Sequence, residues 1–389
     1  MKPVKILSVD DETDLELLLT QYFRRKIRKG EYEFYFAHNG LEALTILLRE
    51  KNIDIILSDI NMPEMDGLTL LTKVNEMQNP ALKCIMVSAY GDMGNIRSAM
   101  NNGAFDFATK PIDLDDLSLT IEKAIEQIEY IKQAQAEHSQ LESLKTDLAV
   151  AAEIQQAILP RVFPPFPEND KELELAALMT PARDVGGDFY DFFRIDTDRI
   201  GVVMADVSGK GIPAAIFMAV SRTLIRTIGL QGGAPGACLT KANELLSQES
   251  VDSMFVTVFY AIYNIYTGEL TYSNGAHNSP YILRADGAVE QMPTSTNCIV
   301  GAIDGLEYTN ENARLGVGDT LVMYTDGVNE AFNEACQEYG DERMAQLLRR
   351  VSGESCRTVI DEQLSDVRAF AGQAPQSDDI TIMALRRKA

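Results

Sequence analysis

Soft metal-binding side chains are scarce in this sequence of 389 residues, which contains only three histidines and five cysteines. The cysteines are scattered, odd in number and never spaced as a CxxC pair, so neither a zinc site nor a disulfide framework is indicated. They are Cys84, Cys238, Cys298, Cys336 and Cys356. No histidine metal cluster is indicated either, and we expect a protein of the reducing cytoplasm.

Basic residues and long apolar runs are also in short supply. The chain has 35 Lys plus Arg against 58 Asp plus Glu, a formal net charge of −23 at pH 7. Such a charge repels polyanions, and the sequence contains no basic recognition helix, so a nucleic-acid-binding output is excluded. No apolar run approaches the ~20 residues of a membrane helix, and we expect no membrane span.

The length of the chain predicts two domains, and the first reads as an α/β unit. The runs VKILSV, YEFYFA and IDIILSD alternate with amphipathic stretches, which predicts a doubly wound parallel sheet with its ligand site at the carboxyl ends of the strands. The residues at those ends are Asp10, Asp11, Asp59, Ser88 and Lys110. One such Asp is more often a turn former than a nucleophile, but the full set reverses that preference.

These residue types suit phosphoryl chemistry. Asp59 can attack phosphorus, and Asp10 and Asp11 can hold Mg²⁺. Lys110 and Ser88 can bind the oxygens of the transferred group. The pattern therefore predicts a domain that is phosphorylated on an aspartate.

Residues 1–125 resemble the receiver domain of two-component response regulators. The runs VDDE and DINMPEMDG, the serine at position 88 and the KP pair that begins at position 110 follow the family in order and spacing. The resemblance implies that Asp59 is the phosphoacceptor and that a sensor histidine kinase or phosphotransfer protein is a partner. The implied Mg²⁺ site consists of Asp10, Asp11, Asp59 and the Asn61 carbonyl. The implied switch residues are Ser88, Phe107 and Lys110, although a half-buried core ring at position 107 fits the sequence equally well.

A helical connector is predicted at residues 126–160. No glycine occurs between positions 114 and 159, and Ala, Glu, Gln, Leu and Lys dominate. Apolar residues follow a coiled-coil spacing first at Leu117, Ile121, Ala124, Ile128 and Ile131, and again at Leu141, Leu144, Leu148, Ala151 and Ile158. The seam weakens at Gln135 and His138, where steps of three residues form a stammer. We expect a homodimer through this connector, and the alternative is a helix that docks on its own domains.

After the proline-rich stretch LPRVFPPFP, residues 161–389 combine long hairpins with helices, which predicts an α+β sandwich. Four acidic islands follow apolar, β-prone runs: Asp188 in VGGDFYD, Asp206 in ADVSGKGIP, Asp326 in YTDGVNE, and Asp378 with Asp379 in SDDITI. Hard divalent cations prefer such carboxylates, and two ions can clamp a phosphate and activate water. The islands therefore predict a metal-dependent phosphatase.

Residues 150–389 resemble the SpoIIE/RsbU branch of the bacterial PPM protein serine/threonine phosphatases. The runs AAEIQQAILP, PARDVGGDFYD, ADVSGKGIPAA, SMFVTVFYAIYN, YTDGVNEA and DDITIM carry the resemblance. It implies a catalytic set made of Asp188, Asp206, Asp326 and Asp378. It also implies two Mn²⁺ or Mg²⁺ ions bridged by Asp206, one completed by Asp188 and the Val207 carbonyl and the other by Asp326 and Asp378. Asp379 is secondary in this assignment.

The sequence departs from this family in one run, where NGAHNSP replaces an AGHN-like pattern, so His277 receives no catalytic role. Arg183 cannot be assigned to phosphate binding from its spacing alone. We interpret the whole chain as a response regulator in which phosphorylation of Asp59 controls a phosphoprotein phosphatase. The resemblance implies an anti-sigma-factor antagonist as substrate. The alternative is a catalytically silent adaptor that binds the same partner.

Overall fold

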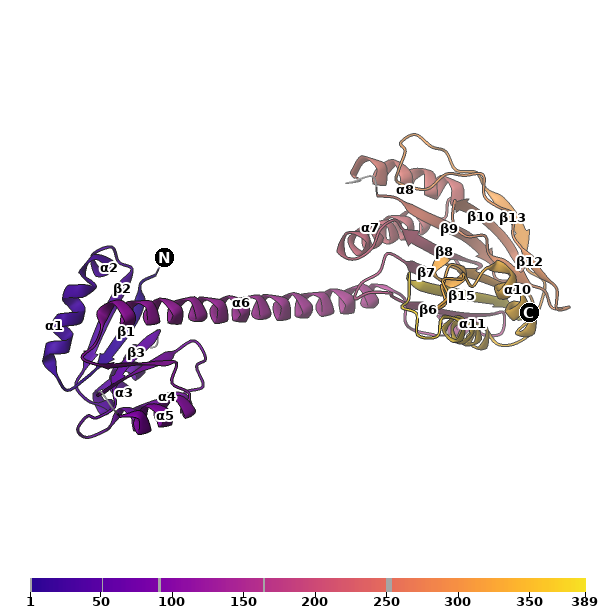
Figure 1. Ribbon diagram of the computed structural model, residues 1–389. Helices are drawn as coiled ribbons and strands as arrows, with labels where there is room; N and C mark the ends of the chain where they lie inside the picture. The colour runs from indigo at the N-terminus through magenta and orange to yellow at the C-terminus, as the bar shows by residue number, and fades with distance from the viewer. Residues whose placement is uncertain (1, 51, 90–91, 164, 250–253) are drawn as a thin grey trace. The chain divides into compact units, whose positions relative to one another are not determined.

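Two compact units make up the computed structural model, Met1–Leu144 and Lys145–Ala389. The structure describes residues 2–50, 52–89, 92–163, 165–249 and 254–389. Ser253, the first residue of the SMFVTVFYAIYN run, lies outside the described residues. Figure 1 shows the helices and strands of each unit and labels most of them.

The N-terminal unit is built around a five-stranded parallel sheet with the strand order β2-β1-β3-β4-β5. Its strands are β1 (Val4–Val9), β2 (Tyr32–Ala37), β3 (Ile55–Asp59), β4 (Lys83–Ala89) and β5 (Asp106–Lys110). Its helices are α1 (Thr13–Tyr22), α2 (Arg24–Arg28), α3 (Gly40–Arg49), α4 (Gly67–Glu76) and α5 (Met93–Asn101), followed by the start of α6 (Leu114–Ile158). The predicted doubly wound receiver fold is confirmed, because apolar clusters cover both faces of this sheet.

The long helix α6 is continuous, as the absence of glycine predicts, but the first half of its apolar seam does not face a second helix. Leu117, Ile121, Ala124 and Ile128 are buried in the core of the N-terminal unit itself. The prediction that these residues form a coiled-coil seam is therefore wrong. The apolar residues do share one face of the helix, but this face is covered by the domain's own sheet. This arrangement agrees with the alternative, a helix that docks on its own domain.

The C-terminal unit is a sandwich of two five-stranded sheets, with the orders β13-β10-β9-β8-β7 and β12-β11-β14-β15-β6. The strands of the first sheet are β7 (Phe189–Arg194), β8 (Arg199–Val207), β9 (Val256–Asn264), β10 (Glu269–Gly275) and β13 (Glu311–Arg314). Those of the second are β6 (Leu173–Thr180), β11 (Tyr281–Leu283), β12 (Val289–Gln291), β14 (Thr320–Tyr324) and β15 (Ile380–Arg387). All pairings between these strands are antiparallel.

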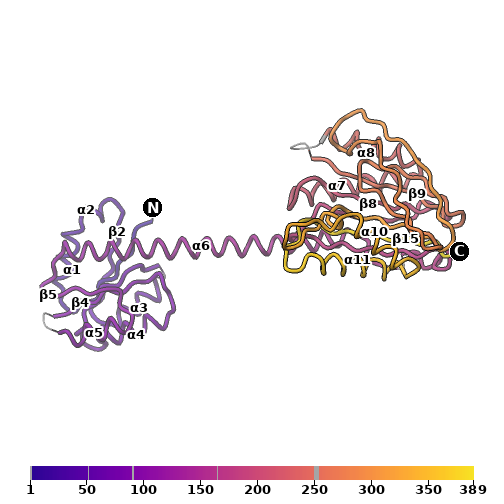
Figure 2. Tube along the Cα trace, turned by 45° about the vertical axis from the view of Figure 1, so that its right-hand side comes forward, coloured from indigo at the N-terminus to yellow at the C-terminus, as the bar shows by residue number. Residues whose placement is uncertain are grey.

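Helices cover the outer faces of both sheets (Figures 1 and 2). The helical segments are η1 (Pro167–Asn169), α7 (Ile212–Gly229), α8 (Pro235–Glu249), α9 (Asp326–Asn329), α10 (Asp341–Arg350) and α11 (Cys356–Ala371). Helices α7 and α8 pack on the first sheet, and α11 packs on β6 and β15 of the second. The predicted α+β sandwich is thereby confirmed.

Among the described residues, α7 is the one helix that is long and apolar enough to cross a membrane, with a mean hydropathy of 1.3 over 18 residues. Its buried residues Ala214, Met218 and Ile225 belong to the core of the C-terminal unit. The helix also packs against β7, β8 and α8. Packing inside this unit therefore accounts for one face of the helix, while Ile212, Ile216 and Val220 are 40–61% exposed.

A buried ion pair fastens α7 to β7. The side chain of Asp191 is 1% exposed, and its carboxylate lies 2.6 Å from Arg226 and 3.2 Å from Arg222. The backbone N–H of Phe192 donates a third contact at 2.8 Å. Since the Arg222 side chain is only 11% exposed, the carboxylate is needed to balance a charge that has little access to water.

Replacing Asp191 by Asn should destabilise the C-terminal unit by about 3–5 kcal/mol, because it leaves a buried guanidinium uncompensated. Urea unfolding followed by circular dichroism measures the loss. The matched control is Asp196→Asn, which weakens an ion pair with Arg199 whose side chains are 40% and 41% exposed. That exposed pair should contribute at most ~1 kcal/mol. Equal losses in the two variants would contradict the role given to Asp191.

Candidate active sites

Four charged side chains converge at the carboxyl ends of β1, β3 and β5 in the N-terminal unit. The Nζ of Lys110 lies 2.9 Å from a carboxylate oxygen of Asp59 and 3.0 Å from one of Asp10. Carboxylate oxygens of Asp10, Asp11 and Asp59 all lie within 4.8 Å of one another. Three carboxylates this close fit a hard divalent cation.

The electrostatics of this group reflect its crowding. Burial raises the pKa of Asp10, although a backbone hydrogen bond from Glu12 and contacts with Lys110 oppose the shift. Burial alone would lower the pKa of Lys110, but its hydrogen bonds to Asp59 and Asp10 raise it above the usual range. Lys110 therefore carries a stable positive charge beside Asp59, where a phosphoryl group would arrive.

The backbone at Gly67 lies very close to the backbone carbonyl of Asp59. A Cβ atom at Gly67, in the MDG run, would lie 2.1 Å from the Asp59 carbonyl oxygen, so only glycine fits there. Ser88 is fully buried at the end of β4, and Asn61 is exposed two residues after Asp59. Phe107 is 36% exposed on β5, which agrees with both interpretations of this ring.

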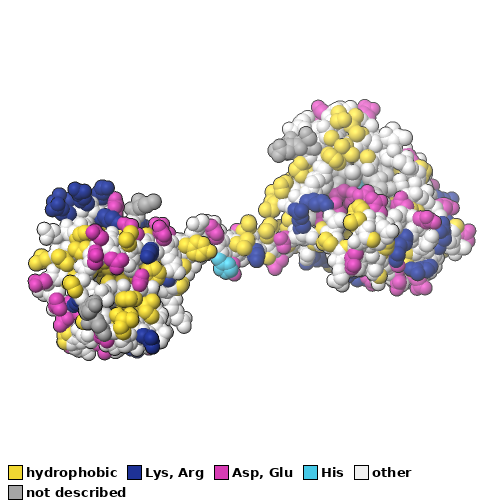
Figure 3. All heavy atoms as spheres, in the orientation of Figure 1, with side chains coloured by type: hydrophobic (Ala, Val, Ile, Leu, Met, Phe, Trp, Pro, Cys, Tyr) yellow, Lys and Arg dark blue, Asp and Glu magenta, His cyan; other side chains and the backbone are white. Residues whose placement is uncertain are grey.

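The second group of acidic residues gathers in the C-terminal unit, and Figure 3 shows acidic side chains collected on the visible face of this unit beside α7. Asp206 lies near the end of β8, and Asp326 begins α9 directly after β14. Asp188 and the Asp378–Asp379 pair precede β7 and β15, so they lie at strand beginnings and not at strand ends. Antiparallel pairing brings both kinds of strand terminus to the same edge.

Asp188 is the most deeply buried of these carboxylates, with 1% of its surface exposed. The hydroxyls of Thr325 and Thr381 both donate to its Oδ2, at 2.6 and 2.7 Å. Sequence reasoning missed these two threonines. Thr325 lies between β14 and Asp326 in YTD, and Thr381 lies in β15 two residues after Asp379 in DDIT. This closeness to predicted acidic residues is the signal that could have found them.

The Asp379 carboxylate accepts hydrogen bonds from several backbone N–H groups. One carboxylate oxygen accepts from the N–H of Ala182 at 2.8 Å, and the other accepts from the N–H of Gly187 at 2.7 Å. The N–H of Asp188 approaches the same oxygen at 3.4 Å. The side chain thus ties the start of β15 to the loop before β7, a supporting role that agrees with its secondary place in the sequence assignment.

The carboxylates of the C-terminal cluster repel one another. Burial raises the pKa of Asp206 to about 7, and the charge of Asp326 adds to this shift while a hydrogen bond with Asp188 opposes it. Burial and the charge of Asp378 raise the pKa of Asp326 to about 6. Burial and the charges of Asp206 and Asp379 raise the pKa of Asp188 well above its usual range.

Asp206 thus interacts with Asp188 through a hydrogen bond and with the charges of Asp326, Asp378 and Asp379. A carboxylate that interacts with all the other acidic residues of the cluster suits the role of a ligand shared by two cations. Among the described residues, only the cluster of the N-terminal unit places three carboxylate oxygens within 4.8 Å, so the C-terminal cluster is the more open of the two.

The backbone beside the C-terminal cluster leaves room for a bound cation. A Cβ atom at Gly187 would lie 2.9 Å from the Val207 carbonyl oxygen, and one at Gly186 would lie 2.1 Å from an Asp379 oxygen. Gly209 follows with a φ of +88° in the turn after β8. Acidic oxygens, a carbonyl kept free of side chains and raised carboxyl pKa values together fit a divalent metal site.

Two further polar residues lie at this edge. Lys210 makes an ion pair with Asp378 at 2.8 Å and donates to the Ser377 carbonyl. His277 is buried, and its Nδ1 lies 2.8 Å from the Thr257 hydroxyl, while burial lowers its pKa to about 4. A neutral, buried imidazole held by β9 agrees with leaving His277 out of the predicted catalytic set.

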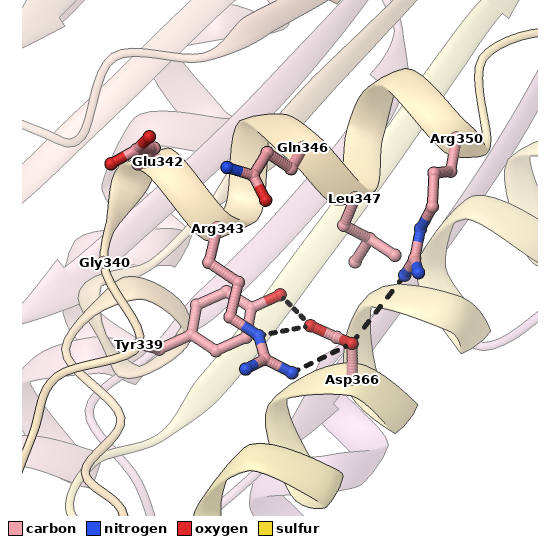
Figure 4. A pocket seen from close by; sticks show the side chains of 8 residues that line it. All are labelled: Tyr339, Gly340, Glu342, Arg343, Gln346, Leu347, Arg350 and Asp366. Carbon is pink, nitrogen blue, oxygen red and sulfur yellow. Dashed lines mark hydrogen bonds and ion pairs between the residues drawn. The ribbon is translucent and has the colours of Figure 1, made fainter.

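A separate cavity of about 590 Å³ lies along α10 and α11. Figure 4 shows Arg343 and Tyr339 turned toward Asp366, with Arg350 approaching from the C-terminal end of α10. Arg343 and Tyr339 donate to Asp366 at 2.9 and 2.7 Å, and Arg350 lies 3.7 Å away. Asp366 on α11 is paired with two arginines of α10 and none of these residues is a predicted ligand, so this cluster joins the two helices.

Comparisons with known proteins divide the chain in the same way. The model for the response regulator receiver domain matches residues 6–122, and that for stage II sporulation protein E (SpoIIE) matches residues 196–388. The phosphoserine phosphatase RsbU of Bacillus subtilis (strain 168) is 28% identical over 250 residues, which are 64% of this chain and 72% of RsbU.

Protein IcfG of Synechocystis sp. is 27% identical over 271 residues, 62% of this chain. The match spans only 42% of IcfG, so the chain corresponds to less than half of that relative. The solved SiaA-PP2C domain of Pseudomonas aeruginosa matches with a TM-score of 0.55 and 24% identity, covering 63% of this chain and 98% of that domain. A likeness at this identity shows a shared fold.

Proposed function

Because this chain joins a response regulator receiver domain to a PPM phosphatase domain of the SpoIIE family, we propose that phosphorylation of Asp59 controls the hydrolysis of a phosphoprotein. The substrate carries phosphoserine or phosphothreonine. The observation that carries this proposal is the set of buried, mutually repelling carboxylates around Asp206. We propose that the chain consists of a receiver domain at residues 1–125, a connector at 126–160 and a phosphatase domain at 161–389.

The residues of the phosphatase site have separate tasks in this proposal. Asp206 is shared by two metal sites, one with Asp188 and the Val207 carbonyl and one with Asp326 and Asp378. Mn²⁺ or Mg²⁺ bound there supplies charge for the phosphate and lowers the pKa of a bound water toward ~7. Thr325 and Thr381 hold Asp188 in place through their hydroxyls.

In the receiver, Asp59 is the nucleophile toward a phosphoryl donor, and Lys110 stabilises the charge on the phosphoryl oxygens. Asp10, Asp11, Asp59 and the Asn61 carbonyl form its Mg²⁺ site. Ser88 and Phe107 complete the switch. The donor is a sensor histidine kinase or a phosphotransfer protein, and we place the whole pathway in the cytoplasm.

The substrate proposed is an anti-sigma-factor antagonist or a similar small regulator, which the likeness to RsbU supports. A catalytically silent adaptor that binds the same partner is the second candidate. The presence of all four proposed metal carboxylates, Asp188, Asp206, Asp326 and Asp378, favours the enzyme, since binding alone would not require them.

Turnover of phosphoprotein with Mg²⁺ or Mn²⁺, before and after acetyl phosphate treatment, tests the proposal. We expect metal-dependent release of phosphate whose rate changes when Asp59 is phosphorylated. Substrate binding without release in either metal would favour the adaptor. Release that is unchanged by acetyl phosphate would contradict control by the receiver.

A homodimer through the connector remains part of the proposal, and it now rests on Leu141 and Leu144, which are 50% and 52% exposed on α6. If they meet their counterparts in a second copy, light scattering should give twice the monomer mass. Leu144→Glu should then be monomeric, because it places charge in the seam. Leu119→Glu, at a site 57% exposed on the same helix, is the matched control. A monomeric wild type would contradict the dimer.

A further inference from the structure

The end of α6 contacts the phosphatase site through one side-chain amide. Gln155 lies in the last turn of α6 and is 6% exposed. Its Nε2 donates to the carbonyl oxygen of Gly186, and the N–H of Gly186 donates back to its Oε1 at 3.0 Å. Both backbone hydrogen-bonding groups of one buried residue are thus satisfied by one side chain.

Gly186 is held from its other side by the acidic cluster. A Cβ at this residue would collide with Asp379, and the next N–H, that of Gly187, donates to Asp379 at 2.7 Å. Asp188 follows directly. The loop before β7 is therefore clamped between the Gln155 amide and the Asp379 carboxylate, and this clamp fixes where the Asp188 carboxylate emerges.

We propose that Gln155 is a positioning residue through which α6 sets the metal affinity of the phosphatase site, an inference that rests on the proposed function. Without the amide, the N–H and carbonyl of Gly186 are buried and unpaired, which the loop can relieve only by moving. A metal site tolerates ligand displacements of only about 0.5 Å. A shift of this loop therefore weakens cation binding even though Gln155 touches no metal.

The same amide connects the site to the rest of α6. The first turns of this helix are part of the receiver core, and Gln155 lies in its last turn. A rotation or axial shift of α6 on the phosphatase domain would move the amide away from Gly186. Receiver phosphorylation then has a route to the metal site that requires no new contact.

The test compares Gln155→Leu with Gln156→Leu, the same change at the neighbouring exposed position. Three quantities are measured on the full chain: the Mn²⁺ dissociation constant by calorimetry, hydrogen exchange of the 184–188 segment, and the thermal midpoint. We expect Gln155→Leu to raise the dissociation constant about tenfold or more. Exchange at Gly186 should accelerate, and lost turnover should return at high Mn²⁺. Gln156→Leu should match wild type.

If Gln155 has a purely structural role, its replacement should lower the thermal midpoint. The Mn²⁺ dissociation constant, measured at a temperature well below that midpoint, should then stay unchanged. This result would overturn the proposal. If Gln155→Leu does not fold, Gln155→Asn replaces it, because its shorter amide cannot reach both groups of Gly186. The same rise in the dissociation constant is expected. A wild type that binds Mn²⁺ but releases no phosphate would refute the proposed function, while the comparison of dissociation constants would still decide the role of Gln155.

Discussion

Replacing Asp206 by asparagine is expected to lower metal-supported phosphatase turnover by at least ~100-fold. This residue interacts with Asp188 and with the charges of Asp326 and Asp378, and in the proposed function it is shared by both metal sites. Removing its charge therefore weakens both proposed metal sites together. Loss of a residue that only supports a ligand costs about 10- to 100-fold, and a shared ligand should cost more.

The measurement is phosphate release from phosphoprotein over a range of Mn²⁺ concentrations. Asp286→Asn, the same change at an exposed turn between β11 and β12, should behave as wild type. The burial that raises the pKa of Asp206 to about 7 also predicts that asparagine will be tolerated structurally, since a neutral side chain relieves repulsion in the absence of metal. Near-normal turnover at saturating Mn²⁺ would remove Asp206 from the metal site.

Replacing Asp59 by alanine should abolish labelling of the receiver by acetyl phosphate and Mg²⁺. Among the carboxylates of this cluster, Asp59 lies at the end of the central strand β3 and contacts Lys110 at 2.9 Å. It is also one of the three residues whose oxygens gather within 4.8 Å. The nucleophile, the carboxylates that would hold a cation and the positive charge of Lys110 therefore meet at this residue.

Intact mass before and after treatment gives the result directly. Asp66→Ala removes the carboxylate that caps α4 by accepting from the Thr69 N–H, which costs about 1 kcal/mol of stability but should leave labelling intact. Persistent labelling of Asp59→Ala would indicate a second acceptor, and the phosphatase rate of that variant would then show which site carries control.

The sequence predicted those features that follow from strand patterns and from their polar ends. The parallel sheet of the receiver, the sandwich and the convergence of the acidic islands all follow from where apolar runs stop and carboxylates begin. The prediction of a coiled-coil seam was wrong for the first part of α6, where Leu117 and Ile121 have coiled-coil spacing but are buried in the receiver core. Periodicity reveals that a helix face is covered, and it does not reveal by what.

Side-chain partners were also beyond the sequence. Gln155 reads as an ordinary helix former, and nothing in its neighbours points to Gly186, although the amide is buried against that residue. The two arginines on α7 that balance Asp191 could be taken for surface charges of an amphipathic helix. Such contacts depend on which elements meet in three dimensions, and single-sequence patterns carry little of that information.

The pairing of β6 with β15 has a consequence for the order of folding. Asp379 at the start of β15 accepts from the N–H of Ala182, which is 197 residues earlier in the chain. Contacts with such a large sequence separation form late, because the chain must first close a long loop. The joint that assembles the carboxylates is thus among the most non-local in the domain. Binding of a divalent cation should consequently coincide with the last steps of refolding. The time course of metal binding during refolding would therefore report when these steps occur.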